Sequence, residues 1–334
     1  MFEAVLSGMP DGVLVFDQSE KLVYANAAAL KIFSVRGENI AEKRFLEIAR
    51  VSQLDDLLQQ VRKSGEAGEL EVKAFLPEEK DLLAEASLIS PDKLVLVVRD
   101  VTAMKRLENL RRDFVANVSH ELKTPLTAIR GYVETLLAGA VDDRENNRLF
   151  LQKILLNTDN LATLIEDILE ISSLEARRKD VPFIKIDLTA LVDRAIETVS
   201  AKAKAKKITL IKLADHPSCS ITGDPEHLTR ALINLLDNAV NYSDQGGKVE
   251  LFCEKAGDLL RLNVRDHGIG IDQQHLERIF ERFYRIDKAR SRDQGGTGLG
   301  LSIVKHIMEF HNGSVAVQSQ LGQGSTFTLI FPAA

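Results

Sequence analysis

The stretch that decides the fold covers residues 114–127 and reads FVANVSHELKTPLT. Val118 and Leu122 are four residues apart, which is the spacing of neighbours on one face of a helix. His120 lies two residues from each of them, about 200° around the helix, and therefore faces water. Pro125 removes one backbone hydrogen bond inside the helix and favours a kink. We predict a helix that presents a histidine on its polar face.

The neighbours of this histidine favour a chemical role for it. A lone histidine on a helix surface is most often an ordinary polar residue. Here Glu121 follows His120 directly, and Thr124 lies one turn later on the same face. A neutral imidazole, with a pKa near 6.5, offers a ring nitrogen to an electrophile. The adjacent carboxylate can accept the proton that leaves the other nitrogen, so the pattern indicates a nucleophile with a base beside it.

Helical periodicity extends over residues 103–180. Apolar residues recur every three or four positions from Leu107 to Leu136 and again from Leu151 to Leu169, with a polar break between the two stripes. The first helix would span about 35 residues, or roughly 50 Å. Because neither stripe has other cover, a second copy of the chain is the simplest partner for both. We predict an antiparallel helical hairpin that forms a dimeric four-helix bundle.

The segment before this hairpin mixes strands with short helices. Strands are predicted over residues 13–16 and 22–24, and Asn26 is placed to cap a helix that follows them. Three further strands are predicted, over residues 69–76, 82–89 and 94–99. The order is therefore a strand pair, short helices and a three-strand meander.

The segment after the hairpin follows a break at Pro182. Asp224 and Pro225 are predicted to begin a helix as its cap and its first residue. Two glycine-rich loops follow, at residues 266–270 and 295–300, and the second opens a helix whose free N–H groups can receive phosphate. The P-loop motif Gly-x-x-x-x-Gly-Lys-Ser/Thr does not occur in the chain. Along the helix predicted to begin at Pro225, four polar residues recur at every fourth position: Arg230, Asn234, Asn238 and Tyr242.

Taken in order, these motifs resemble those of sensor histidine kinases of two-component systems. The first segment is similar to a PAS sensor domain, and the RRDF run at residues 111–114 is most like the phosphate-regulon type of this family. The resemblance rests on the phospho-acceptor box (114–127), the N-box of Bergerat-fold or GHKL ATPases (234–239), two glycine boxes (266–271 and 296–304), the F-box (280–285) and a last sheet element (322–327).

The resemblance implies a multidomain α+β protein with three parts. These are a PAS-like α/β domain over residues 1–102, the dimerisation and histidine-phosphotransfer hairpin over residues 103–180, and a catalytic ATP-binding α/β sandwich over residues 183–334. It further implies that His120 is autophosphorylated from Mg-ATP with help from Glu121. The phosphoryl group would then pass to an aspartate of a separate response regulator. Phosphatase activity towards that regulator is also implied, with Thr124 helping to place water.

The same resemblance implies a set of nucleotide-binding residues. Asn238 would hold Mg²⁺, with Asn234 as a second candidate, because hard oxygen ligands suit this ion. Asp266 would accept a hydrogen bond from the adenine amino group. The implied ATP-binding residues are Asn234, Asn238, Asn241, Tyr242, Asp266, Gly268, Gly270, Ile271, Phe283, Arg285, Lys288, Gly296, Thr297, Gly298, Leu299, Gly300, Leu301 and Thr326.

Two positions depart from the family pattern. Asn241 stands where the family usually has a lysine that contacts phosphate, which leaves Arg285 and Lys288 to supply positive charge. His267 replaces a common asparagine in the first glycine box. The loss at Asn241 gives weight to a rival hypothesis, namely a dimeric sensor that binds nucleotide but acts as a scaffold or phosphatase. A second rival is a different Bergerat-fold ATPase, such as a chaperone, topoisomerase or mismatch-repair protein, which would not need the acceptor box.

Composition narrows the function classes further. The formal net charge of -6 argues against tight direct binding to nucleic acid. Cys219 and Cys253 lack metal-ligand spacing, and no run of about 18 apolar residues occurs. We therefore expect a cytoplasmic protein, or the cytoplasmic portion of an inner-membrane sensor. Residues 1–100 contain neither His nor Cys, which excludes a histidine-ligated haem or a flavin–cysteine adduct there. The signal, and whether phosphorylation occurs within or across the dimer, stay open.

Overall fold

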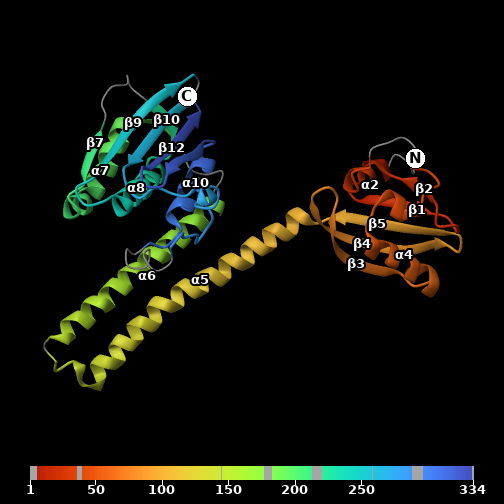
Figure 1. The fold of residues 1–334 in the computed structure, drawn as a ribbon, viewed down its shortest axis with the longest axis horizontal. Coiled ribbons are helices and arrows are strands. Elements are labelled where there is room, and N and C mark those ends of the chain that lie inside the picture. The colour runs from red at the N-terminus through yellow and green to blue at the C-terminus, as the bar shows by residue number, and fades with distance from the viewer. Residues whose placement is uncertain are drawn as a thin grey trace. The chain divides into compact units, whose positions relative to one another are not determined.

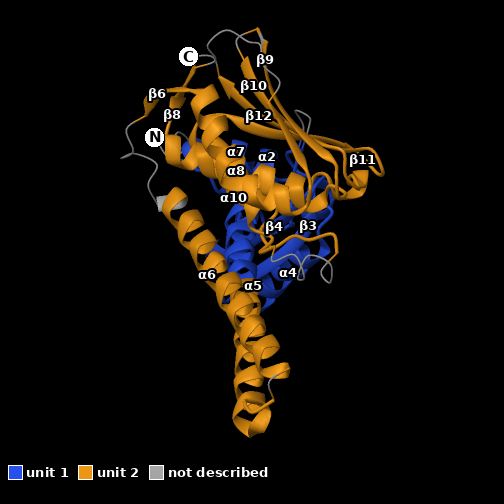
Figure 2. Cartoon of the chain, turned by 90° about the vertical axis from the view of Figure 1, so that its left-hand side faces the viewer, with its two compact units in different colours: residues 1–115 blue, residues 116–334 orange. Residues whose placement is uncertain are grey.

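The computed structural model describes residues 6–35, 40–143, 145–176, 183–212, 220–257, 259–287 and 296–332. The chain divides into two compact units, residues 1–115 and residues 116–334 (Figure 2). Each unit has its own hydrophobic core. Within the described residues, no helix combines the length and the apolar character that crossing a bilayer requires.

Unit 1 is an antiparallel sheet with short helices packed against it (Figure 1). The strand order is β2-β1-β5-β4-β3, so the first strand lies beside the last one. The predicted strand pair and meander are both present. The elements are β1 (Gly12–Phe16), β2 (Leu22–Ala25), α2 (Ala27–Ile32), α3 (Phe45–Ile48), α4 (Ser52–Ser64), β3 (Gly68–Phe75), β4 (Glu79–Ser90) and β5 (Lys93–Asp100).

Asn26 joins β1 to α2. Its Oδ1 accepts hydrogen bonds from the backbone N–H groups of Ala29 and Val13, each at 2.9 Å, which confirms the predicted cap. Its Nδ2 donates to the carbonyls of Leu6 and Asp11, also at 2.9 Å. With only 2% of its surface exposed, this amide is a buried polar group with four partners, and it holds β1 and α2 together.

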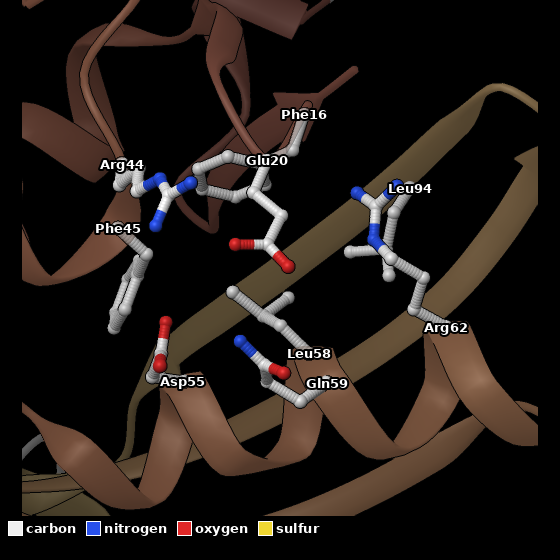
Figure 3. A pocket seen from close by; sticks show the side chains of 9 residues that line it. All are labelled: Phe16, Glu20, Arg44, Phe45, Asp55, Leu58, Gln59, Arg62 and Leu94. Carbon is white, nitrogen blue, oxygen red and sulfur yellow. The ribbon is translucent and has the colours of Figure 1, made fainter. Parts of the chain in front are cut away.

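A small cavity lies in unit 1 between α4 and the sheet (Figure 3). Its volume is about 20 Å³, which is room for about one water molecule. Polar side chains of Glu20, Asp55 and Gln59 point into it. A cavity of this volume is far too small for a haem or a flavin. Burial raises the pKa of the Asp55 carboxyl, and the nearby negative charges of Glu20 and Asp56 add to the effect.

Two long helices form the hairpin of the second unit. They are α5 (Thr102–Thr135), which begins in unit 1, and α6 (Asn146–Ala176). A π-helical turn, η1 (Leu136–Ala140), ends α5, and Gly139 there has a φ of 119°, which suits a residue without a Cβ. The 34 residues of α5 match the predicted length, and Pro125 lies inside the helix. No residue of α5 is buried within one chain.

The rest of unit 2 is a sheet with helices on one face (Figure 1). The strand order is β11-β12-β10-β9-β7, and only β7 runs parallel to its neighbour. A separate strand pair, β6 with β8, lies beside it. The elements are β6 (Ile184–Asp187), α7 (Leu188–Ala205), β7 (Thr209–Lys212), β8 (Ser220–Gly223), α8 (Pro225–Tyr242), β9 (Lys248–Ala256), β10 (Leu259–Asp266), η2 (Gln273–His275), α10 (Gly300–Phe310), β11 (Ser314–Gln320) and β12 (Gly324–Pro332).

Helix α8 is fixed at its start and along its buried face. The Asp224 Oδ1 accepts from the N–H groups of Glu226 at 2.7 Å and His227 at 3.2 Å, and Pro225 is the first helical residue, as predicted. Leu232, Leu235 and Leu236 are fully buried in the core, which leaves the opposite face of α8 for polar residues. Hydrophobic burial on this side therefore sets which α8 side chains can meet a ligand.

His311, just after α10, is a buried neutral imidazole. Its Nε2 accepts from the Asp224 N–H at 2.9 Å, and its Nδ1 lies 2.7 Å from the Ile307 carbonyl, where it donates. Phe183 stacks on the ring with centroids 4.9 Å apart. Burial lowers the pKa of His311. Both ring nitrogens are thus used by backbone groups, and the charged form would lose the bond at Nε2.

This arrangement predicts acid sensitivity. The unfolded imidazole has a pKa near 6.5 and the folded one a lower pKa, so below about pH 6.5 the unfolded chain binds more protons. The free energy of unfolding should therefore fall as pH drops through about 6.5. Urea unfolding at pH 7.5 and 5.5 measures this. The His311→Gln variant should be less stable at both pH values, with a smaller difference between them. An equal pH difference in both proteins would contradict the prediction.

Candidate nucleotide site

The polar face of α8 borders a cleft of about 550 Å³ in unit 2. Arg230, Asn234, Asn238, Asn241 and Tyr242 all line it. The Asn234 Nδ2 donates to the Gly300 carbonyl at 3.4 Å, which joins the helix to the second glycine box. The volume falls within the range of small-molecule sites, and the four-residue repeat seen in the sequence delivers its residues to one place.

Asp266 forms one end of the cleft, where β10 stops. Its Oδ1 accepts from the N–H groups of Gly268 at 2.9 Å and Ser325 at 3.2 Å, and only 4% of the residue is exposed. Burial raises the pKa of this carboxyl, while the two backbone hydrogen bonds oppose the rise. The Oδ1 is fully used, so Oδ2 is the oxygen that can accept from a ligand.

Two glycines keep this end of the cleft compact. A Cβ on Gly268 would lie 2.1 Å from the Tyr242 carbonyl oxygen, and a Cβ on Gly270 would lie 2.0 Å from that of Gln320. Gly270 also has a φ of 68°. Any side chain at either position would push the loop away from α8 or β11, so the first glycine box is required by close backbone approach.

The other end of the cleft is formed by the second glycine box and the F-box. The Gly298 carbonyl accepts from the Phe283 N–H at 2.9 Å, and Gly298 has a φ of 74°. The Thr297 Oγ1 accepts from the Leu299 N–H at 3.2 Å. Helix α10 begins directly after this turn, at Gly300, so its first N–H groups are directed towards the cleft.

The hairpin helix α6 supplies a buried carboxylate to this end. Asp167 accepts from the Arg230 Nη2 and from the Thr297 Oγ1, both at 2.8 Å, and is 4% exposed. Glu170 lies 3.2 Å from the Arg230 Nε. Burial raises the pKa values of both carboxyls, and their hydrogen bonds and attraction to Arg230 oppose the rise. The hairpin and the cleft therefore share a polar cluster.

The predicted acceptor box meets the cleft through Glu121. The Glu121 Oε2 lies 3.2 Å from the Arg285 Nη2, and the Arg285 side chain is 9% exposed. His120 is exposed on α5, as predicted from the apolar stripe. Thr124 is exposed as well, and its Oγ1 donates to the His120 carbonyl at 3.1 Å.

The cleft includes most of the predicted nucleotide residues but not all. Gly268, Phe283 and Leu299 lie behind its surface, where they shape the loops. On β12 the lining residues are Ser325 and Phe327, so Thr326, between them, belongs to the other face of the strand. Lys288, Pro182 and Cys219 lie outside the described residues.

Several lining residues were missed by sequence reasoning. Thr163 and Asp167 come from α6 and Lys202 from α7, while Asp237 shares α8 with the recognised residues. Thr163, Asp167 and Lys202 lie outside the glycine-rich and asparagine motifs, whereas Asp237 lies inside the N-box (234–239) but was not predicted to bind nucleotide. The only sequence signal for Asp167 is a charged residue within an apolar helical stripe, and the same pattern occurs at many solvated positions.

Comparison with known proteins agrees with this geometry. Residues 223–334 match the family model "Histidine kinase-, DNA gyrase B-, and HSP90-like ATPase", residues 110–177 the "His Kinase A (phospho-acceptor) domain" and residues 1–65 a PAS domain. The sensor-like histidine kinase SenX3 of Mycolicibacterium smegmatis is 37% identical over 342 residues, covering 99% of this chain and 85% of that protein. The sensor histidine kinase WalK of Bacillus subtilis is 31% identical, covering 98% of this chain and 54% of that protein.

Solved structures share the fold. The histidine kinase ThkA, solved in complex with the response regulator protein TrrA, matches with a TM-score of 0.55 at 20% identity, over 97% of this chain and 96% of that one. The Acinetobacter baumannii histidine kinase AdeS gives a TM-score of 0.53 at 24% identity, over 64% of this chain and 97% of that one.

An ATPase cleft joined to a phospho-acceptor hairpin defines an ATP-dependent protein-histidine kinase. The chain belongs to the sensor histidine kinase family, with PAS, phospho-acceptor and GHKL-type ATP-binding domains. The predicted family and fold class are thereby confirmed. The rival assignment to a chaperone, topoisomerase or mismatch-repair ATPase is wrong, because the phospho-acceptor domain is present.

Asp266 offers a direct test of the cleft. In Asp266→Asn the amide must keep its oxygen on the N–H groups of Gly268 and Ser325, so an NH₂ group would face the adenine amino group. Two donors cannot pair, and ATP affinity should fall at least about tenfold in titration calorimetry. The control is Asp272→Asn, which lines the same cleft but caps η2 through a bond to the Gln274 N–H. Equal losses in both variants would contradict the assignment.

Proposed function

We propose that the protein transfers the γ-phosphoryl group of ATP to His120 and then to an aspartate of a response regulator. One ring nitrogen bonds to the γ-phosphorus, the bond from phosphorus to the β,γ-bridging oxygen breaks, and ADP leaves with the electron pair. The proton on the other ring nitrogen passes to Glu121. The observation that carries the proposal is the 3.2 Å contact between Glu121, beside the acceptor, and Arg285 of the cleft.

The domains would have the extents expected from the sequence: residues 1–102 as the PAS-like domain, 103–180 as the phosphotransfer hairpin and 183–334 as the catalytic domain. The first glycine box and Tyr242 would bind the adenine, and the second glycine box would receive the phosphates at the start of α10. The other predicted residues that line the cleft, together with Lys288, would complete the nucleotide site. Thr124, exposed on the same face as His120, would help to place water for dephosphorylating the regulator.

The donor set of the cleft suits Mg²⁺. The side chains of Asn238 and Asn234 face the cleft, and Asn234 uses its NH₂ group on the Gly300 carbonyl, which leaves its Oδ1 to act as a ligand. Amide oxygens are hard ligands of the kind this ion accepts, with phosphate oxygens and water completing the coordination. Bound there, Mg²⁺ would neutralise charge on the phosphates.

A response regulator is the proposed protein partner, because ThkA was solved with one and shares this fold. A second copy of the chain is the other proposed partner, through residues 103–180. Leu110, Leu126, Leu155 and Leu169 are 66%, 59%, 62% and 63% exposed on the two hairpin helices. A repeated apolar stripe left open on two adjacent helices is the feature that a four-helix bundle buries.

The phosphotransfer is tested with γ-labelled ATP and Mg²⁺. The native chain should acquire an acid-labile, alkali-stable label, whereas His120→Gln should acquire none. Because His120 does not line the cleft, the variant should still bind ATP as the native chain does. A label that survives in His120→Gln would place the acceptor elsewhere. ATP binding without any label on the native chain would favour the scaffold or phosphatase hypothesis.

The dimer is tested by adding charge to the open stripe. Leu155→Lys should shift the native dimer towards monomer in sedimentation experiments, since burying the ammonium group in the bundle is costly. Leu259→Lys is the control, because Leu259 is also exposed but lies at the start of β10 in the catalytic domain. If Leu155→Lys remains as dimeric as the control, residues 103–180 do not form the interface.

A further inference from the structure

The cleft as a whole is lined by more carboxylates than fixed positive charges. Asn241 is neutral where the family usually has a lysine. Among the described residues that line the cleft, three side chains carry fixed positive charge: Lys202, Arg230 and Arg285. Five carboxylates line the same cleft: Asp167, Asp237, Asp266, Asp272 and Asp287. A polyphosphate ligand therefore meets an excess of negative groups and needs each cation that can reach it.

The two arginines already hold carboxylates of the hairpin. Arg230 bonds to Asp167 at 2.8 Å and lies 3.2 Å from Glu170. Arg285 lies 3.2 Å from Glu121. Each arginine is therefore partly neutralised by a carboxylate from α5 or α6. Its full charge can act on a ligand only when the ion pair with that carboxylate breaks.

Lys202 differs in origin and in exposure. It lies in the last turn of α7, outside every recognised motif, and its side chain is 46% exposed. Its Nζ lies 2.9 Å from the Asp237 Oδ1, and Asp237 is four residues before Asn241, so the two share a face of α8. The lysine ammonium is thus held within one helical turn of the neutral Asn241.

The end of α7 is fixed against the same turn of α8. The Lys206 Nζ donates to the carbonyls of Val240 at 2.9 Å and Asn241 at 2.6 Å. Val199 and Ala203, on either side of Lys202, are both buried at 2% exposure. The backbone of Lys202 is therefore held in place, while its long side chain can turn from Asp237 towards a ligand.

We propose that Lys202 supplies from α7 the positive charge that α8 lacks at Asn241, and that it contacts the phosphates of bound ATP. The proposal rests on the nucleotide site described above and adds a residue to it. Asp237 holds the ammonium group at the cleft in the absence of nucleotide. Exposed ion pairs stabilise a fold only weakly, so stability alone gives little reason for this pair to be placed at the cleft.

The test compares Lys202→Gln with the native chain for two ligands, ATP and adenosine, by titration calorimetry. Removing one partly exposed phosphate contact should raise the Kd for ATP about five- to tenfold and leave the Kd for adenosine unchanged. The matched control is Lys204→Gln, an equally charged, exposed residue of α7 that does not line the cleft, and it should bind both ligands like the native chain.

A second variant tests whether the affinity is lost because the positive charge is missing or because the structure has changed. Adding Asn241→Lys to Lys202→Gln places an ammonium group at the family position and should restore most of the lost ATP affinity. Equal losses for ATP and adenosine in Lys202→Gln would overturn the proposal, as would a failure of Asn241→Lys to rescue. An unchanged Kd for ATP would overturn it while leaving the nucleotide site intact. Failure of the native chain to bind ATP would instead refute the nucleotide site itself.

Discussion

The contact between helix α6 and the nucleotide cleft depends on one buried carboxylate, that of Asp167. A carboxylate that is 4% exposed costs free energy unless its oxygens are paired, and here each oxygen has a partner, Arg230 or Thr297. One partner lies on α8 and the other lies in the second glycine box. The carboxylate can remain buried only while α6, α8 and the glycine box keep these positions, so it couples the hairpin to the nucleotide cleft.

Close backbone packing is the second constraint on the cleft. Asp266 is reached by the N–H groups of Gly268 and Ser325 because Gly324 brings β12 close, and a Cβ on Gly324 would lie 2.2 Å from the Asp266 carbonyl oxygen. The glycines thus allow the backbone to approach, and the approach in turn lets the backbone satisfy the buried acid. The glycines therefore account both for the close backbone packing and for the hydrogen bonds that satisfy the buried Asp266 carboxylate.

Sequence reasoning was most effective where a local rule determined the outcome. The Asn26 and Asp224 caps and the outward position of His120 followed from spacing alone. It was weakest for contacts between residues that are distant in the chain. Asp167 bonds to Arg230 across 63 positions and Lys202 to Asp237 across 35 positions, and no local pattern in the sequence marks such contacts. Thr326 is an instructive intermediate case. Its motif was recognised, but strand alternation directs Ser325 and Phe327 to the cleft.

Helix α6 has two apolar stripes, and they serve different neighbours. Leu164, Ile171 and Leu174 are buried in the same core as the catalytic sheet. Ile165 and Leu169 are 44% and 63% exposed, and at about 100° per residue they lie on roughly the opposite side of the helix. Asp167 belongs to the first stripe. A rotation of α6 that improves packing on the exposed stripe must therefore also move the carboxylate that holds Thr297 and Arg230. Because side chains on one helix turn together, the hairpin's packing and the geometry of the phosphate end of the cleft cannot vary independently.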